Sequence, residues 1–388
     1  MPRQARILWI TEWHPPLGGG MAVSSGRQVE SLRRRGLTVD LLAFTEAENR
    51  AVLRTEYRDG GLDFHLSRTL KPGPAAQQAW HLVSSENARR PYAFTVGFGA
   101  NRPGHLAVTY AAWLDCPSLI LVRGNDFDQD WFDPGRGPWV VGALDRADVI
   151  GVVASGLKNR LQALFPGKNL RLVPNAVDPA WGELLPADRA RRDETRSRLE
   201  GDRKKIIGLF GELKHKKAAP FWLAALRDTG LMDRTALLLV GRRTDEELNQ
   251  VLSDPVLAPR NLCLPFLLRD QLPGLYAACD FLAVPSYYDG LPNVLLEAMS
   301  LGVVPIVSDA GALAEVVQDG ETGFVFPAAD RQAAAEVTAR ALNLPENQRL
   351  AMGRRAREYV IENHSPDREA EVLMDILLGG PETARAGG

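Results

Sequence analysis

Short apolar runs alternate with longer amphipathic segments along the whole chain. The runs predict strands, which are Ile7–Ile10, Val39–Phe44, Leu119–Val122 and Val149–Val153 in the first half and Ile206–Phe210, Leu237–Val240, Asn261–Leu264, Phe281–Val284, Val304–Val307 and Gly323–Phe326 in the second. The amphipathic segments predict helices, which are Ser24–Arg35, Gly104–Leu114, Lys217–Arg227, Asn293–Leu301, Arg331–Leu342, Pro345–Glu362 and Asp367–Leu378. Continuous apolar strands separated by helices are typical of parallel sheets covered on both faces, so the pattern predicts an α/β fold.

A segment rich in charged residues, Leu185–Lys205, separates two halves of the chain, and strands alternate with helices in each half. This arrangement predicts two Rossmann-like, doubly wound parallel-sheet domains, over residues 1–185 and 186–362. Residues 363–388 are expected to form a C-terminal helix that packs back on the N-terminal domain and a small, polar, disordered tail from Gly379. Ligands of such sheets bind beyond the carboxyl ends of the strands, so a cleft between two facing domains is the expected binding site.

Composition narrows the class of protein. The 388 residues carry 46 basic and 48 acidic side chains, a net charge of −2, so a nucleic-acid partner is not expected. Cys116, Cys263 and Cys279 are too far apart for a metal-ligand set or a disulfide framework, which suits a reducing compartment. No apolar run approaches the length of about 18 residues that spans a membrane. The first strand begins almost at Met1, which leaves no room for a signal peptide, and we expect a cytoplasmic protein.

A glycine triplet, Gly18, Gly19 and Gly20, lies between the first strand and the first helix. It lets backbone amides approach a ligand closely, and the helix start adds a positive dipole end. The dinucleotide fingerprint G-x-G-x-x-G is absent, and no acidic residue ends the second strand, so a nicotinamide cofactor is not expected. The alternative interpretation is a flexible turn.

Charged loops follow two other predicted strands. Arg123 comes directly after Leu119–Val122 and is suited to an anionic group, while Asp126 or Asp128 nearby suits hydroxyls. Lys214 and Lys217 follow Ile206–Phe210, where lysines at a strand-to-helix junction can hold phosphate by charge and helix dipole together. In both places a solvated loop is the alternative.

The segment Val284–Glu297 has the most specific pattern. A strand ends at Pro285, and the loop that follows contains Asp289, Gly290, Leu291, Pro292 and Asn293. A helix then begins, with Asn293 as its predicted cap, and carries Glu297. The loop amides suit the oxygens of a sugar or a diphosphate, and Glu297 can accept hydrogen bonds from two vicinal hydroxyls, as on a ribose.

These motifs, in this order, resemble the retaining glycosyltransferases of family four, which have the GT-B fold. Asp289 and Glu297 stand where that family has a Glu-x7-Glu pair. Further matching pieces are Val173–Asp178, which resembles Pro-Asn-Gly-Val-Asp, and Gly302-x-x-Pro305, Gly311 and Gly320-x-Thr322-Gly323. The resemblance covers nearly the whole chain.

The resemblance implies a hexosyltransferase that moves a sugar from a nucleoside-diphosphate donor to an acceptor hydroxyl or other nucleophile, without a metal or other cofactor. It implies that Glu297 binds the donor ribose and that Asp289 contacts the sugar, with the residues from Gly290 to Asn293 nearby. Lys217, helped by Lys214, would neutralise the diphosphate, which Gly19 and Gly20 would approach from the other domain. The acceptor is unidentified. The basic cluster Arg33–Arg35 is interpreted as the C-terminal cap of a helix, or as a peripheral contact with the inner face of the membrane.

Three positions depart from the family pattern. Glu212 stands where the family has an arginine, Asp289 replaces a glutamate, and Arg123 replaces a frequent histidine, so we expect Arg123 to act differently at the catalytic site. Two other interpretations therefore stay open. One is a degenerate GT-B protein that binds a nucleotide or a partner without turnover, and the other is an inverting transferase or a sugar epimerase on the same scaffold.

Overall fold

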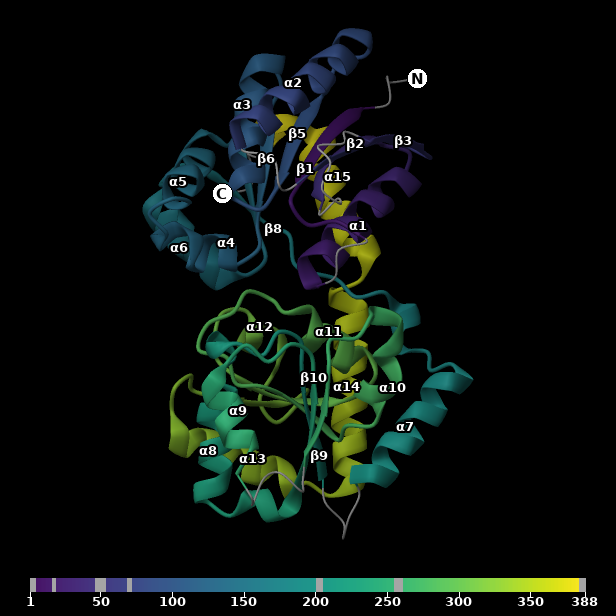
Figure 1. The fold of residues 1–388 in the computed structure, drawn as a ribbon, viewed down its shortest axis with the longest axis vertical. Coiled ribbons are helices and arrows are strands. Elements are labelled where there is room, and N and C mark those ends of the chain that lie inside the picture. Colours follow the sequence, from purple (N-terminus) through teal and green to yellow (C-terminus); the bar gives the residue numbers. More distant parts are fainter. Residues whose placement is uncertain are drawn as a thin grey trace. The chain divides into compact units, whose positions relative to one another are not determined.

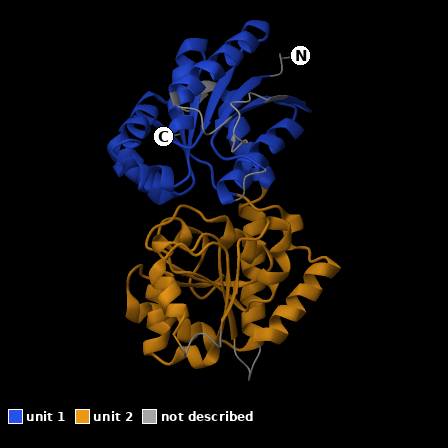
Figure 2. Ribbon diagram, in the orientation of Figure 1, with its two compact units in different colours: residues 1–175, 366–388 blue, residues 176–365 orange. Residues whose placement is uncertain are grey.

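The structure is a computed structural model that describes residues 5–15, 19–45, 54–67, 72–199, 205–254 and 261–383. The chain forms two compact units (Figure 2). Unit 1 comprises residues 1–175 and 366–388, and unit 2 comprises residues 176–365. The predicted α/β class with parallel sheets is confirmed in both units.

Within its described residues, unit 1 contains an eight-stranded sheet in the order β3-β4-β2-β1-β5-β6-β7-β8 (Figure 1). Neighbouring strands run parallel except β3 and β4, which form an antiparallel hairpin. The strands are β1 (Arg6–Thr11), β2 (Thr38–Thr45), β3 (Arg54–Arg58), β4 (Gly61–Ser67), β5 (Phe94–Phe98), β6 (Ser118–Val122), β7 (Val149–Val152) and β8 (Asn169–Leu172). The helices are α1 (Gly20–Arg34), α2 (Pro72–Arg89), α3 (Arg102–Leu114), α4 (Asn125–Asp128), η1 (Asp130–Phe132), α5 (Gly137–Arg146), α6 (Ser155–Leu164) and α15 (Pro366–Thr383).

The central strands β1, β5, β6 and β7 of unit 1 are buried along their whole length, which explains their apolar sequences. In β1, Ile7 and Trp9 point to the face that α1 covers. Helix α15 lies beside α1 (Figure 1), and its residues Leu373 and Ile376 join the same buried cluster. The last helix of the chain is therefore part of the core of unit 1.

Unit 2 contains, in the part of it that the structure describes, a six-stranded parallel sheet in the order β11-β10-β9-β12-β13-β14. The strands are β9 (Lys205–Phe210), β10 (Thr235–Val240), β11 (Asn261–Leu264), β12 (Phe281–Val284), β13 (Val304–Ser308) and β14 (Phe324–Phe326). The helices are η2 (Pro179–Gly182), α7 (Pro186–Leu199), η3 (His215–Lys217), α8 (Ala219–Asp228), η4 (Leu231–Arg234), α9 (Glu246–Leu252), η6 (Arg269–Gln271), α10 (Pro273–Ala277), α11 (Asn293–Ser300), α12 (Leu313–Val316), α13 (Arg331–Leu342) and α14 (Glu346–Asn363).

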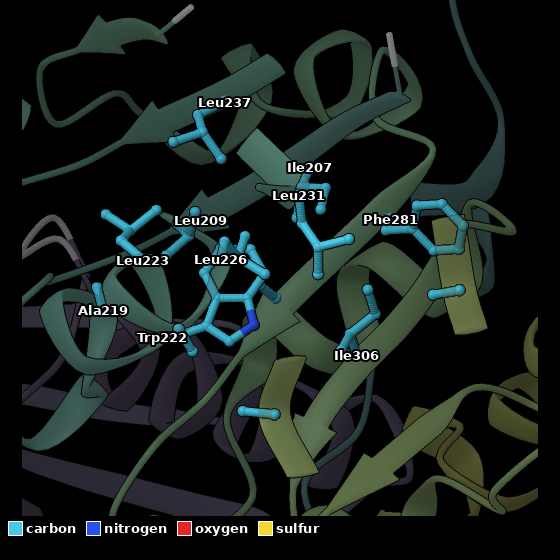
Figure 3. Close-up of a cluster of buried hydrophobic side chains, with 14 of the residues drawn as sticks. Ile207, Leu209, Ala219, Trp222, Leu223, Leu226, Leu231, Leu237, Phe281 and Ile306 are labelled. Carbon is cyan, nitrogen blue, oxygen red and sulfur yellow. The ribbon is translucent and has the colours of Figure 1, made fainter. Parts of the chain in front are cut away.

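The core of unit 2 packs α8 and α13 against one face of this sheet. Trp222 of α8 is fully buried among Ile207, Leu209 and Leu226 (Figure 3). Its indole N–H donates to Thr338 Oγ1 of α13 at 3.2 Å, so the one polar atom of this large side chain is satisfied. Helix α11, which carries the predicted donor residues Asn293 and Glu297, packs on β12, β13 and α14, and α10 lies beside it.

The chain passes between the units at Asn175–Ala176 and Ser365–Pro366, whereas the sequence placed the boundaries at 185/186 and 362/363. The shift arises because residues 176–182 pack on unit 2. Val177 N donates to His364 O at 2.9 Å. At the C-terminus, α15 continues to Thr383, so the predicted disorder from Gly379 is wrong as far as that residue, and residues 384–388 lie outside the described ones.

Candidate functional site

The residues of the candidate donor site follow several strands of the one sheet of unit 2. Parallel strands end at one edge of a sheet, so the segments after β9, β11, β12 and β13 start from a common edge. The segment after β9 carries the lysines, the one after β11 carries Arg269, and the one after β12 carries Asp289. Helix α11 follows directly and carries Glu297.

Asp289 lies between two lysine side chains. Its Oδ1 is 3.1 Å from Lys216 Nζ, and its Oδ2 forms a short ion pair with Lys217. Ser286 Oγ donates to Oδ2 at 3.2 Å, and the amide of Gly290 donates to Oδ1 at 3.1 Å. Both carboxylate oxygens are therefore engaged, and the group as a whole carries one net positive charge.

Burial and charge act in opposite directions on these groups. Burial alone would raise the pKa of Asp289, but Lys217 and Lys216 outweigh it and hold that pKa well below its usual value. Lys216 is only 7% exposed, and its pKa is lowered by burial and by the charge of Lys217 against the opposing effect of Asp289. Asp289 thus stays ionised and holds two ammonium groups at the edge of the sheet.

Local backbone geometry brings the lysine loop and the acidic loop together. After β9 the chain forms the short helix η3, and Tyr287 N donates to Lys216 O at 2.9 Å, which ties the two loops. Gly311 has a φ of +59°, and a Cβ at this position would lie 1.7 Å from Asp289 O. Only glycine permits this approach, so Gly311 fixes the acidic loop from the side of β13.

Glu297 forms the second part of the site. Its carboxylate is almost completely buried, with Oε2 accepting from the hydroxyl of Tyr276 at 3.0 Å and Oε1 accepting from Arg269 Nε at 3.3 Å. Tyr276 stacks on Phe210, with ring centroids 4.0 Å apart, and burial together with Glu297 raises its pKa well above the usual value. Tyr276 therefore acts as a fixed hydrogen-bond donor to Glu297.

Several predicted donor-binding residues take other places than expected. Lys214 is half-buried and pairs with Glu212 at 3.0 Å instead of joining Lys217. Asn293 is not the cap of α11, since Pro292 occupies that position without a side-chain hydrogen bond. Leu291 is buried in the loop before them. Of the two predicted lysines, Lys217 lies against Asp289 and Lys214 does not.

In unit 1, Arg123 follows β6 and is 8% exposed. Its Nη2 donates to Asn175 Oδ1 in a short contact, and its guanidinium lies over the ring of Phe98 at 5.0 Å. Burial lowers the pKa of Arg123 to about 10. Asp126 accepts from the amides of Ala100 and Arg123 at 2.8 and 2.9 Å, and burial raises its pKa to about 6.

The glycine loop is described in part. Gly19 is the N-cap of α1 with a φ of +103°, and Gly20 is the first residue of that helix. The conformation of Gly19 is one that other residues rarely adopt, which explains a glycine at this turn. Gly18 lies outside the described residues.

Sequence reasoning missed four residues of these clusters, which are Lys216, Arg269, Tyr276 and Trp181, the last of which has its ring against the Arg269 guanidinium. Lys216 and Lys217 are adjacent in a run of basic residues, so nothing in the pattern indicates that Lys216 is the more buried. Tyr276 lies in the short helix α10, and its buried hydroxyl group beside Glu297 gives it a role. Arg269 and Trp181 carry no local signal.

Two family models match the chain, one in each half. Residues 18–181 match the model "Glycosyltransferase Family 4", and residues 190–359 match "Glycosyl transferases group 1". The chain belongs to glycosyltransferase family 4. This glycosyltransferase is thus an enzyme of the predicted class, and the predicted family is confirmed.

Relatives of this glycosyltransferase support the same assignment. It is 28% identical, over 97% of its length and 98% of the relative's, to a "GDP-mannose-dependent alpha-(1-6)-phosphatidylinositol monomannoside mannosyltransferase" of Mycobacterium tuberculosis. It is also 28% identical, over 56% of its length and 45% of the relative's, to a "D-inositol 3-phosphate glycosyltransferase" of Salinispora tropica.

Solved structures show the fold. Sucrose-phosphate synthase from Thermosynechococcus elongatus matches with a TM-score of 0.80 and 20% identity, over 95% of this chain and 97% of that one. Anabaena HepE in complex with UDP and glucose matches with a TM-score of 0.76 and 18% identity, over 97% and 100%. The fold of this glycosyltransferase is GT-B. Among the helices described here, none combines the length and apolar character needed to cross a membrane.

Proposed function

We propose that this enzyme transfers a hexosyl residue from a nucleoside-diphosphate sugar to an acceptor hydroxyl or other nucleophile, with retention of anomeric configuration and without a metal or other cofactor. The observation that carries the proposal is the lysine pair on Asp289. In the transition state, charge grows on the departing diphosphate, and fixed cations aimed at it stabilise that charge. Lys216 and Lys217 are two such cations beside a loop that suits a sugar or diphosphate.

The same cluster favours a front-side mechanism. Both oxygens of Asp289 are held by lysines, so this carboxylate is poorly placed to attack the anomeric carbon and form a covalent intermediate. We infer that the bond from C1 to the diphosphate oxygen breaks while the acceptor oxygen bonds to C1 on the same face. The acceptor proton passes to the leaving diphosphate, and the nucleoside diphosphate is released. Ammonium groups in place of a carboxylate pair support a reaction that needs no divalent ion.

Glu297 is proposed to bind the donor ribose, with Asp289 and residues 290–293 on the sugar. In unit 1 we propose that Gly19 and Gly20 approach the diphosphate and that Arg123 contributes to the catalytic site. Because the Mycobacterium tuberculosis relative is named as GDP-mannose-dependent and as acting on a phosphatidylinositol mannoside, GDP-mannose and that glycolipid are the first donor and acceptor to test.

A combined assay tests this proposal. Transfer is measured with GDP-mannose and UDP-glucose, with and without EDTA, and the anomeric configuration of the product is read by NMR. Retention and EDTA resistance are expected. Lys217→Ala and Glu297→Ala should lose transfer and donor affinity. If both variants keep the rate and affinity of the wild type, the site assignment is wrong, and an inverted product would contradict the mechanism.

A further inference from the structure

Trp181 contacts both of the groups that hold Glu297. The guanidinium carbon of Arg269 lies 4.4 Å from the centroid of the Trp181 ring. The ring of Tyr276 meets Trp181 edge-on, with centroids 6.4 Å apart and an interplanar angle of 68°. Arg269 and Tyr276 in turn donate to the two different oxygens of Glu297. Trp181, Arg269, Tyr276 and Glu297 thus form a closed cluster.

The backbone fixes the place of Trp181. Helix η2, which carries it, is capped by Asp178, whose carboxylate accepts from Ala180 N at 2.9 Å. At Gly182 a Cβ would lie 2.6 Å from Ser300 O, the last residue of α11, so η2 packs directly on that helix. Since α11 also carries Glu297, Trp181 and the carboxylate are held on two elements that pack directly against each other.

We propose that Arg269 and Trp181 are positioning residues for the donor ribose, an inference that rests on the proposed function of Glu297. A carboxylate has about four lone-pair sites, and Tyr276 and Arg269 occupy one on each oxygen. One site remains on each oxygen, which matches the two vicinal hydroxyls of a ribose. Arg269 and Tyr276 select which sites remain, and Trp181 holds the guanidinium plane by stacking.

The chemistry of arginine suits this role. A guanidinium can stack on an indole face and donate within its plane at the same time, which an ammonium group cannot do. Arg269 is 34% exposed while Glu297 is 7% exposed, so the arginine covers the carboxylate on its solvent side. Without the stack, the long side chain would turn into solvent and leave Glu297 with one donor.

The test compares ribonucleotides with 2′-deoxyribonucleotides. Binding of GDP, UDP and their 2′-deoxy analogues is measured by calorimetry on the full chain. The wild type should prefer the ribonucleotide by about tenfold, the value of one hydrogen bond to a charged group. Arg269→Leu and Trp181→Leu should reduce this ratio to about two or less. Trp181→Phe should retain it, because a phenyl ring still stacks and, among the described residues, the indole N–H has no hydrogen-bond partner to lose.

A matched control comes from the same unit. Arg340 lies over the ring of Phe324 at 5.5 Å and pairs with Asp319, an arginine–aromatic–carboxylate cluster away from Glu297. Arg340→Leu should leave the ratio unchanged. If Glu297→Ala abolishes the preference while Arg269→Leu and Trp181→Leu keep it, the positioning role is wrong and the ribose site stands. If the wild type shows no preference for the ribonucleotide, or if Glu297→Ala keeps that preference, Glu297 does not bind the ribose. The proposed function of Glu297 is then wrong, and this inference is wrong with it.

Discussion

Arg27 of α1 and Glu369 of α15 form a two-point ion pair within unit 1. Arg27 Nε lies 2.8 Å from Glu369 Oε2, and Arg27 Nη2 lies 2.9 Å from Oε1. Gln28 adds a third hydrogen bond to Oε1 at 2.7 Å. Glu369 is 2% exposed, so the last helix of the chain is joined to the first by a buried, fully bonded carboxylate.

Removing that carboxylate should destabilise unit 1. Glu369→Ala leaves Arg27 buried without its partner, which costs roughly 3–5 kcal/mol of unfolding free energy. Asp367 is the matched control, because it lies on α15 like Glu369 and pairs with Arg35 but is 80% exposed. Asp367→Ala should cost less than about 1 kcal/mol of unfolding free energy. Urea unfolding followed by circular dichroism measures both. Equal losses of unfolding free energy in the two variants would show that the buried ion pair stabilises unit 1 no more than the exposed one.

Lys216 and Lys214, two lysines of the loop after β9, should differ in their effect on catalysis. Lys216→Ala removes a buried cation from Asp289 and should raise the barrier to transfer by roughly 2–4 kcal/mol. Lys214→Ala removes only an exposed pair with Glu212, worth less than about 1 kcal/mol. Turnover at saturating donor distinguishes them. A Lys214→Ala loss as large as that of Lys216→Ala would assign the diphosphate to the outer lysine instead.

Gly311 should be essential for the position of Asp289. Gly311→Ala places a methyl group against Asp289 O, and an error of about 1 Å at a reacting group can cost about a hundredfold in rate. Gly320, with a φ of +76° and no atom within 4 Å of its would-be Cβ, is the matched control. Gly320→Ala carries only the backbone strain, roughly 1–2 kcal/mol of stability, and should keep its activity. Activity and thermal unfolding of both variants separate strain from displacement.

The strands of unit 2 could be predicted because β9, β10, β12 and β13 are continuous apolar runs. The hairpin β3–β4 was not predicted, since the edge strand β3 is almost entirely polar and β4 alternates polar and apolar side chains. Its turn, Asp59-Gly60, is the local signal that would have indicated it. Strand β8 was also missed, because it is a half-buried edge strand with an arginine in it.

The candidate site could be predicted where its residues follow a strand within one motif. Lys217, Asp289 and Glu297 satisfy that condition. Arg269 and Trp181 do not, because they meet Glu297 only through the packing of η2 and η6 on unit 2, which no local pattern encodes. The sequence placed Arg123 correctly at the end of β6. Its burial, however, depends on a contact with Asn175, which follows β8 and is distant in the sequence, so the environment of Arg123 could not be predicted.

Asp126 should make the stability of unit 1 depend on pH. Burial raises its pKa from an ordinary value near 3.8 to about 6, so between these values the folded state binds a proton that the unfolded state has lost. Unfolding then releases a proton, and stability falls as the pH rises from about 4 to about 6, by roughly 3 kcal/mol in total.

Asp126→Asn removes this titration while keeping one side-chain oxygen for the backbone amides of Ala100 or Arg123. The stability of the wild type relative to this variant should therefore decrease between pH 4 and pH 7. Urea unfolding at intervals across that range measures the difference, in which the titration of all other groups cancels. A difference that stays constant with pH would mean that Asp126 is ionised in the folded protein throughout, with the adjacent Arg123 guanidinium outweighing its burial.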